Sequence, residues 1–90
     1  MEYFLRFTEN EIADCERGNS FFKNTDEQLA GLCGFQIADS DEEFSKLNVE
    51  ARVLQFQNNF GYNSKPVIFR GEYIGQGPVE GCLFEPVEII

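Results

Sequence analysis

Three helix-start signals interrupt a chain that otherwise alternates hydrophobic and polar residues over short stretches. Each signal is a capping box, in which a hydroxyl residue is followed three positions later by Glu or Gln. The three boxes are Thr8 with Glu11, Thr25 with Gln28 (a segment that also has turn composition), and Ser40 with Glu43. Short segments between them show the period-two alternation that is typical of strands. Short helices interleaved with strands predict an α+β fold.

The strongest strand pattern is Pro66–Ile74, where Val67, Phe69 and Tyr73 lie on one face. Val49–Phe56 also favours a strand, because Val49, Ala51 and Val53 alternate with charged residues, although an extension of the preceding helix stays open. We expect the remaining strands at Glu2–Thr8, Asn19–Lys23, Gly31–Ala38 and Gly81–Ile90, the last either a strand pair or one strand broken at Pro86. The prediction is a single small domain over residues 1–90, with an antiparallel or mixed sheet of about five to six strands and two short helices packed on one face.

Two helices are expected after strands. The first runs from Glu9 to about Arg17, and the second begins after Ser40. Turn residues predict a loop at Asn58–Ser64 and a turn at Gly75–Pro78.

Composition excludes several classes of chemistry. The chain of 90 residues has no His, so it has no histidine general base, no His-activated nucleophile and no His metal ligand. Its net charge of −9 argues against direct binding to nucleic acid or to an anionic membrane. Cys15, Cys33 and Cys82 are widely spaced, which favours buried free thiols over a metal site or a disulfide framework. We therefore expect no cofactor and no metal, and a non-enzymatic protein.

The start of the chain shows no basic leader followed by an apolar run. Together with the free thiols, this indicates a cytoplasmic protein.

Acidic residues are concentrated in two blocks that flank a short basic one. Such a charge pattern favours a basic protein partner, because complementary fields speed association and suppress wrong partners. The hypothesis is a protein-binding inhibitor or antagonist of a basic nucleic-acid-handling protein, of the kind a phage would encode, with carboxylates mimicking phosphates. Phe60 and Tyr62, placed in a polar loop, would act as exposed aromatic anchors. The predicted partner-binding residues are Asp39, Asp41, Glu42, Glu43, Phe60 and Tyr62.

Two alternatives stay open. Arg6, Arg17 and Arg70 could recognise a nucleotide-type ligand, because the guanidinium group matches phosphate. The other alternative is an oligomer-forming structural module, such as a homodimer that pairs free edge strands.

The alternative of a nucleotide-type ligand also draws on a resemblance between part of the sequence and a known family. Leu5-Arg6-Phe7-Thr8, followed by a helix and by Arg17-Gly18-Asn19-Ser20-Phe21-Phe22, resembles the opening of an ADP-ribosyltransferase-type domain. The resemblance implies a reduced nucleotide-handling fold in which Glu85 would match the catalytic acid of that family. The histidine that the family usually carries on its first strand is absent, and the chain is shorter than those enzymes.

Overall fold

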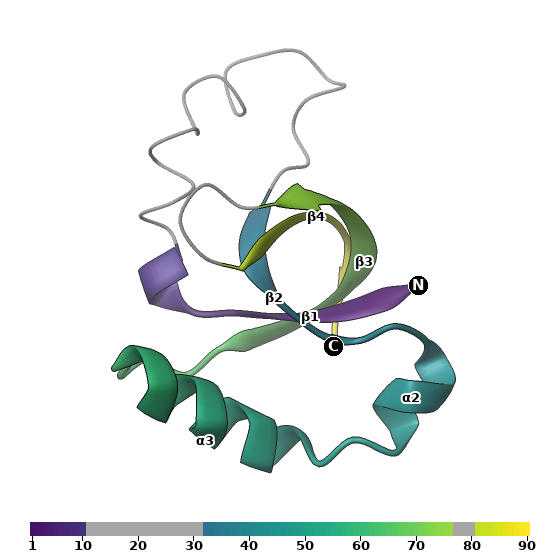
Figure 1. Ribbon diagram of the computed structural model, residues 1–90. Helices are drawn as coiled ribbons and strands as arrows, with labels where there is room; N and C mark the ends of the chain where they lie inside the picture. The colour runs from purple at the N-terminus through teal and green to yellow at the C-terminus, as the bar shows by residue number, and fades with distance from the viewer. Residues whose placement is uncertain (11–31, 77–80) are drawn as a thin grey trace, which may run out of the picture.

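The computed structural model describes residues 1–10, 32–76 and 81–90 of the chain (Figure 1). Within these ranges it contains four strands, one 3-10 turn and two α-helices. The strands are β1 Glu2–Arg6, β2 Leu32–Ala38, β3 Val67–Gln76 and β4 Cys82–Ile89. The turn is η1 Thr8–Asn10, and the helices are α2 Asp41–Ser45 and α3 Val49–Phe60. Among the described residues, no helix is long and apolar enough to cross a membrane.

The four described strands form a small closed barrel in the order β1-β2-β4-β3 (Figure 1). Every neighbouring pair is antiparallel. The small α+β domain and its antiparallel sheet are confirmed, whereas five to six strands are not. The C-terminal segment, predicted as a strand pair or as one strand broken at Pro86, is one continuous strand that passes through Pro86. The predicted strand Asn19–Lys23 lies outside the described residues.

One face of the sheet lines the inside of the barrel. Phe4 and Phe84 stack there with ring centroids 4.3 Å apart, and Phe69 meets Phe84 at 5.4 Å. Gly34 of β2 makes room for this packing. A Cβ at Gly34 would lie 2.7 Å from the carbonyl oxygen of Leu5 and 2.8 Å from the Phe84 ring, so only glycine fits.

The other face of the sheet carries a second core beneath the helices. Tyr3 and Leu5 of β1, and Phe7 directly after it, alternate with the residues that face the barrel interior, and Phe35 of β2 joins them. Both described α-helices lie on this side of the barrel, as Figure 1 shows. Only α2 corresponds to one of the two helices that the sequence predicts, so their packing on one face stays a prediction. The helical and loop residues that pack on this core are Phe44, Leu47, Val53, Phe56 and Tyr62.

The capping box at Ser40 is present and starts α2. Ser40 is extended, with φ −154°, and its hydroxyl accepts a 3.1 Å hydrogen bond from the backbone N–H of Glu43. The Glu43 carboxylate in turn accepts from the backbone N–H of Asp39. This reciprocal arrangement satisfies backbone donors at the helix start, which explains why so short a helix forms there.

The strand predicted at Val49–Phe56 is wrong, because these residues form the first two turns of α3. Asn48 caps this helix, its side-chain oxygen accepting from the N–H of Ala51 at 3.2 Å. Helical spacing places Val53, Phe56 and Phe60 on one side of α3, where Val53 and Phe56 pack on the core and Phe60 stacks on Phe35. Ala51 is exposed. The helix ends at Gly61, whose φ of 69° is left-handed, so the predicted loop starts there rather than at Asn58.

The first predicted helix is only partly within the described residues. Thr8–Asn10 form a 3-10 turn in which Asn10 Oδ1 accepts from the N–H of Phe7 at 2.8 Å. Glu11, the second member of the capping box at Thr8, lies outside the described residues, as do the box at Thr25 and the helix up to Arg17. The turn predicted at Gly75–Pro78 is also only partly described, and Gly75 and Gln76 still belong to β3.

Candidate functional site

The acidic residues around α2 are all exposed, yet most have a local hydrogen-bonding role. Asp41 Oδ1 accepts a 2.8 Å hydrogen bond from the hydroxyl of Tyr3 in β1. Asp39 accepts from the side-chain amide of Gln36, and Glu43 completes the cap. Glu42 lies 3.5 Å from Lys46, but both side chains are highly exposed, so this pair contributes little. Of the four acids, Glu42 is the one most available to another molecule.

Tyr3 joins α2 to the sheet. Its ring stacks on Phe44 with centroids 3.9 Å apart, while its hydroxyl reaches Asp41. The hydrogen bond to the Asp41 carboxylate, reinforced by burial, raises the pKa of Tyr3 above its ordinary value. Tyr3 is also the register partner of Arg70 in β3. The α2 carboxylates are thereby held beside the β3–β4 pair of strands.

Arg70 is occupied by an ion pair. Its Nη2 lies 2.6 Å from Glu88 Oε1, directly across the two strands. This hydrogen-bonded contact raises the pKa of Arg70. Beside it, Glu72 of β3 lies opposite Glu85 of β4, and both side chains are exposed. Within the described ranges, neither Glu72 nor Glu85 has a salt-bridge partner.

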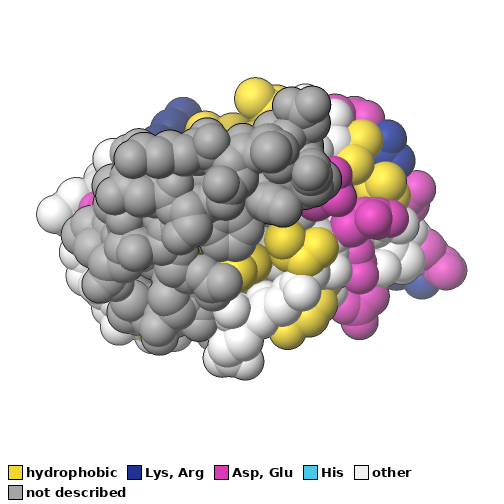
Figure 2. All heavy atoms as spheres, turned by 90° about the horizontal axis from the view of Figure 1, so that it is seen from above, with side chains coloured by type: hydrophobic (Ala, Val, Ile, Leu, Met, Phe, Trp, Pro, Cys, Tyr) yellow, Lys and Arg dark blue, Asp and Glu magenta, His cyan; other side chains and the backbone are white. Residues whose placement is uncertain are grey.

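Together these segments form one acidic surface, which we call the acidic face. It is built from α2 and from the β3–β4 pair of strands, bridged by Tyr3 and Arg70. Figure 2 shows acidic side chains grouped on one side of the molecule, next to exposed hydrophobic ones. Within the part of the chain that the structure describes, Lys46 and Arg70 are the basic residues that pair with this face. Its carboxylates are Asp39, Asp41, Glu42, Glu43, Glu72, Glu85 and Glu88.

The two predicted aromatic anchors belong to a stacked cluster over the second core. Phe60 closes α3 instead of lying in a loop, and it stacks on Phe35 at a centroid distance of 4.9 Å. Tyr62 packs against Phe7 at 5.0 Å and is half-buried. Phe60 keeps 39% of its surface exposed, so it is the more accessible of the two.

The arginines of the ligand alternative do not share a pocket. Arg6 pairs in register with Val67, on the barrel-lining face, whereas Arg70 pairs with Tyr3 on the opposite face. Arg17 lies outside the described residues. Glu85 points to the same side as Glu72, and so away from Arg6.

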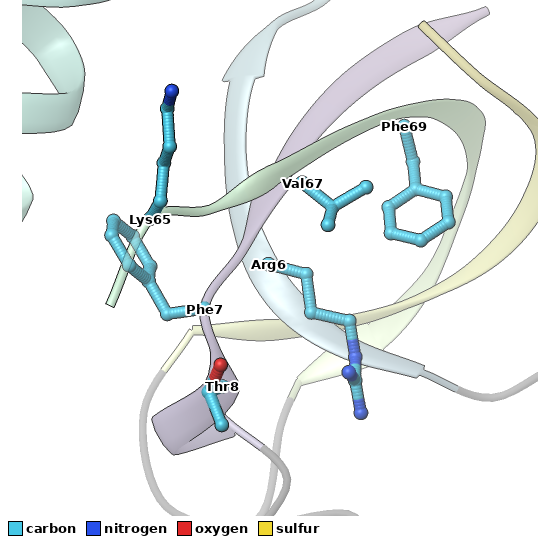
Figure 3. Close-up of a pocket in the computed structure, with 6 residues that line it drawn as sticks. All are labelled: Arg6, Phe7, Thr8, Lys65, Val67 and Phe69. Atoms are coloured by element: carbon cyan, nitrogen blue, oxygen red, sulfur yellow. The ribbon is translucent and has the colours of Figure 1, made fainter.

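A cavity of about 230 Å³ does adjoin Arg6, at the end of the barrel (Figure 3). Lys65 also borders it, but Figure 3 shows the charged ends of Lys65 and Arg6 pointing in different directions, so they do not converge on one anion. Its remaining lining residues are Phe7, Thr8, Val67 and Phe69.

Other chemistries find little support in the described residues. Cys33 and Cys82 are both buried, as predicted, and burial raises the pKa of the Cys82 thiol, which disfavours its reactive thiolate form. Cys15 is outside the described ranges. No group of three or more potential metal ligands occurs within those ranges. Each described strand has two neighbours, so none offers a whole free edge for dimer formation.

Sequence reasoning did not place Glu72, Glu85 and Glu88 with the α2 acids. The available signal was the strong strand pattern before the predicted turn at Gly75–Pro78, followed by a second strand segment that carries Glu85 and Glu88. Only the pairing register shows that these acids lie side by side. Comparison with known proteins found no matching family model, no similar curated protein and no similar solved structure.

Proposed function

We propose that this protein is a non-enzymatic binding module whose acidic face recognises a basic protein. The observation that carries the proposal is the joining of two acidic segments, α2 and the β3–β4 pair of strands, into one face through the Tyr3–Asp41 and Arg70–Glu88 contacts. Complementary potentials of this kind steer encounter and reject like-charged partners. Phe60, at the edge of the aromatic cluster, is the proposed hydrophobic anchor.

The form of this function that we propose is antagonism of a nucleic-acid-handling protein. Such proteins carry channels of Lys and Arg that bind a phosphate backbone. A small rigid domain with spaced carboxylates fits the same chemistry and competes for the channel. A phage-encoded inhibitor that mimics DNA would act in this way.

The test is capture from a host lysate on the immobilised full chain, at low and at moderate salt. We expect retention of a basic nucleic-acid-binding protein that moderate salt releases, since salt screens exposed charges. Duplex DNA added at low salt should displace the same protein. Retention that neither salt nor DNA changes would overturn the electrostatic mechanism.

A matched pair of variants assigns the binding to the acidic face. Glu42→Gln and Gln55→Lys each raise the net charge by one, but only Glu42 lies on the acidic face. Glu42 is chosen because it neither caps a helix nor contacts Tyr3. We expect Glu42→Gln to weaken capture several-fold and Gln55→Lys to leave it close to wild type. Equal losses in both would show that net charge alone governs binding.

A further inference from the structure

The outward side of the β3–β4 pair of strands combines uncompensated carboxylates with exposed aliphatic side chains. We call this side the ribbon face. Two register irregularities each leave one residue without a direct partner, Ile74 in β3 and Val87 in β4. Both are about half exposed, at 51% and 50%. The ribbon face comprises Arg70, Glu72, Ile74, Glu85, Val87 and Glu88.

The centre of the ribbon face is unfavourable for the fold itself. Glu72 and Glu85 lie directly opposite each other, and like charges in that position destabilise a sheet. Within the described residues, no basic side chain forms a salt bridge with either one. Arg70 is the nearest base along β3, and it is engaged by Glu88. A cation supplied from outside would remove this repulsion.

The order of side chains along the ribbon face indicates what kind of molecule would supply that cation. The Glu72–Glu85 pair lies between Val87 at one end and Ile74 at the other. Steps of two residues separate Glu72 from Ile74 and Glu85 from Val87, which is the spacing of side chains on one face of an extended strand. An extended peptide with aliphatic, basic and aliphatic residues at alternate positions matches this order.

We propose that the ribbon face docks an extended segment of the partner that places Lys or Arg between two aliphatic side chains. The inference rests on the proposed function and names the part of the acidic face where contact is centred. A second copy of this chain does not fit, because it would bring the same carboxylates against Glu72 and Glu85. The charge also excludes a nucleic acid as occupant.

The probe is the synthetic peptide acetyl-Leu-Ser-Arg-Ser-Leu-amide, titrated into isotope-labelled full-length protein and followed by NMR. We expect amide shifts confined to residues 72–74, 85, 87 and 88. Replacing Arg by Glu, or both Leu by Ser, should each raise the dissociation constant about tenfold or more.

Protein variants provide the second arm. Glu85→Gln should weaken peptide binding about tenfold, while Glu50→Gln, the same charge change on α3, should leave it unchanged. Shifts centred on residues 39–43 would overturn the ribbon proposal and leave the basic-partner function intact. No peptide binding at all would also overturn it. The proposed function is tested separately by the lysate capture, and it fails if that capture is insensitive to salt and DNA.

Discussion

The hydroxyl of Tyr3 in β1 donates a 2.8 Å hydrogen bond to Asp41 at the start of α2, joining residues 38 positions apart. The same tyrosine ring stacks on Phe44. A single side chain thus fixes both the position of α2 and the orientation of its acidic first turn against the barrel.

Replacing Tyr3 by Phe separates these two roles. The stack on Phe44 is retained, but Asp41 loses its donor, so we expect a lower free energy of unfolding in urea and faster amide exchange in α2. The amides of the barrel strands should exchange as slowly as in the wild type. If α2 exchange were unchanged, the hydrogen bond would not be what holds the helix.

The raised pKa of Tyr3 predicts a loss of stability at alkaline pH. A group whose pKa is higher in the folded state stabilises the protein below its unfolded pKa, here about 10. That contribution disappears as pH rises through the folded value. The free energy of unfolding, measured in urea from pH 8 to 11, should fall less in Tyr3→Phe than in the wild type. Parallel curves for the two proteins would contradict this assignment.

Glu9 predicts the opposite dependence at acidic pH. Its carboxylate accepts from the Ser64 hydroxyl and from the backbone N–H of Asn63, and these bonds lower its pKa. The resulting stability is present above the unfolded pKa of about 4.5 and is lost as pH falls through the folded value. Ser64→Ala should flatten this part of the curve. An acid limb identical to wild type would show that the bond to Ser64 is not responsible.

The barrel interior predicts the most damaging substitution. Phe84 is fully buried and meets both Phe4 and Phe69, so Phe84→Ala should reduce the free energy of unfolding by about 3–5 kcal/mol. Phe60→Ala, on a residue that is 39% exposed, should cost clearly less. Denaturant titration compares the two, and equal losses would contradict the assignment of Phe84 to a tightly packed barrel interior.

The end of α3 gives a conformational test. Gly61 has a φ of 69° with open space where a Cβ would be, so Gly61→Ala should cost about 1–2 kcal/mol through backbone strain alone. Gly75→Ala is the control, since Gly75 also has open space and its φ is not positive. Gly61→Asn should recover part of the loss, because Asn tolerates this conformation better. Equal effects at both glycines would refute a strain-based explanation.

Local signals predicted the parts of the fold that depend on local chemistry. The Ser40 capping box and the strands at Gly31–Ala38 and Pro66–Ile74 could be read from neighbouring residues alone. The helix over Val49–Phe56 could not be predicted in this way, because its apolar residues fit both the two-residue period of a strand and the 3.6-residue period of a helix. The cap at Asn48 and the tertiary contacts of Val53 and Phe56 decide for helix.

The candidate site depended on information that a sequence does not contain locally. Asp39–Glu43 were identified by their charge, but their link to Glu88 runs through Tyr3 and Arg70. The opposition of Glu72 and Glu85 follows from strand register, which the two irregularities at Ile74 and Val87 determine. Arg6 and Arg70 could be grouped by residue type, yet strand alternation puts them on opposite faces.

The closed order of the barrel has a consequence for synthesis on the ribosome. β1 is made first, but both of its neighbours come later, and its pairing partner in β3 runs from Val67 to Gly71. Closure therefore waits until most of the chain has been translated, and it joins segments far apart in sequence, which slows folding. Until then the apolar side chains Phe4 and Leu5 are not fully buried. The nascent chain is therefore most prone to aggregation or chaperone binding in that interval.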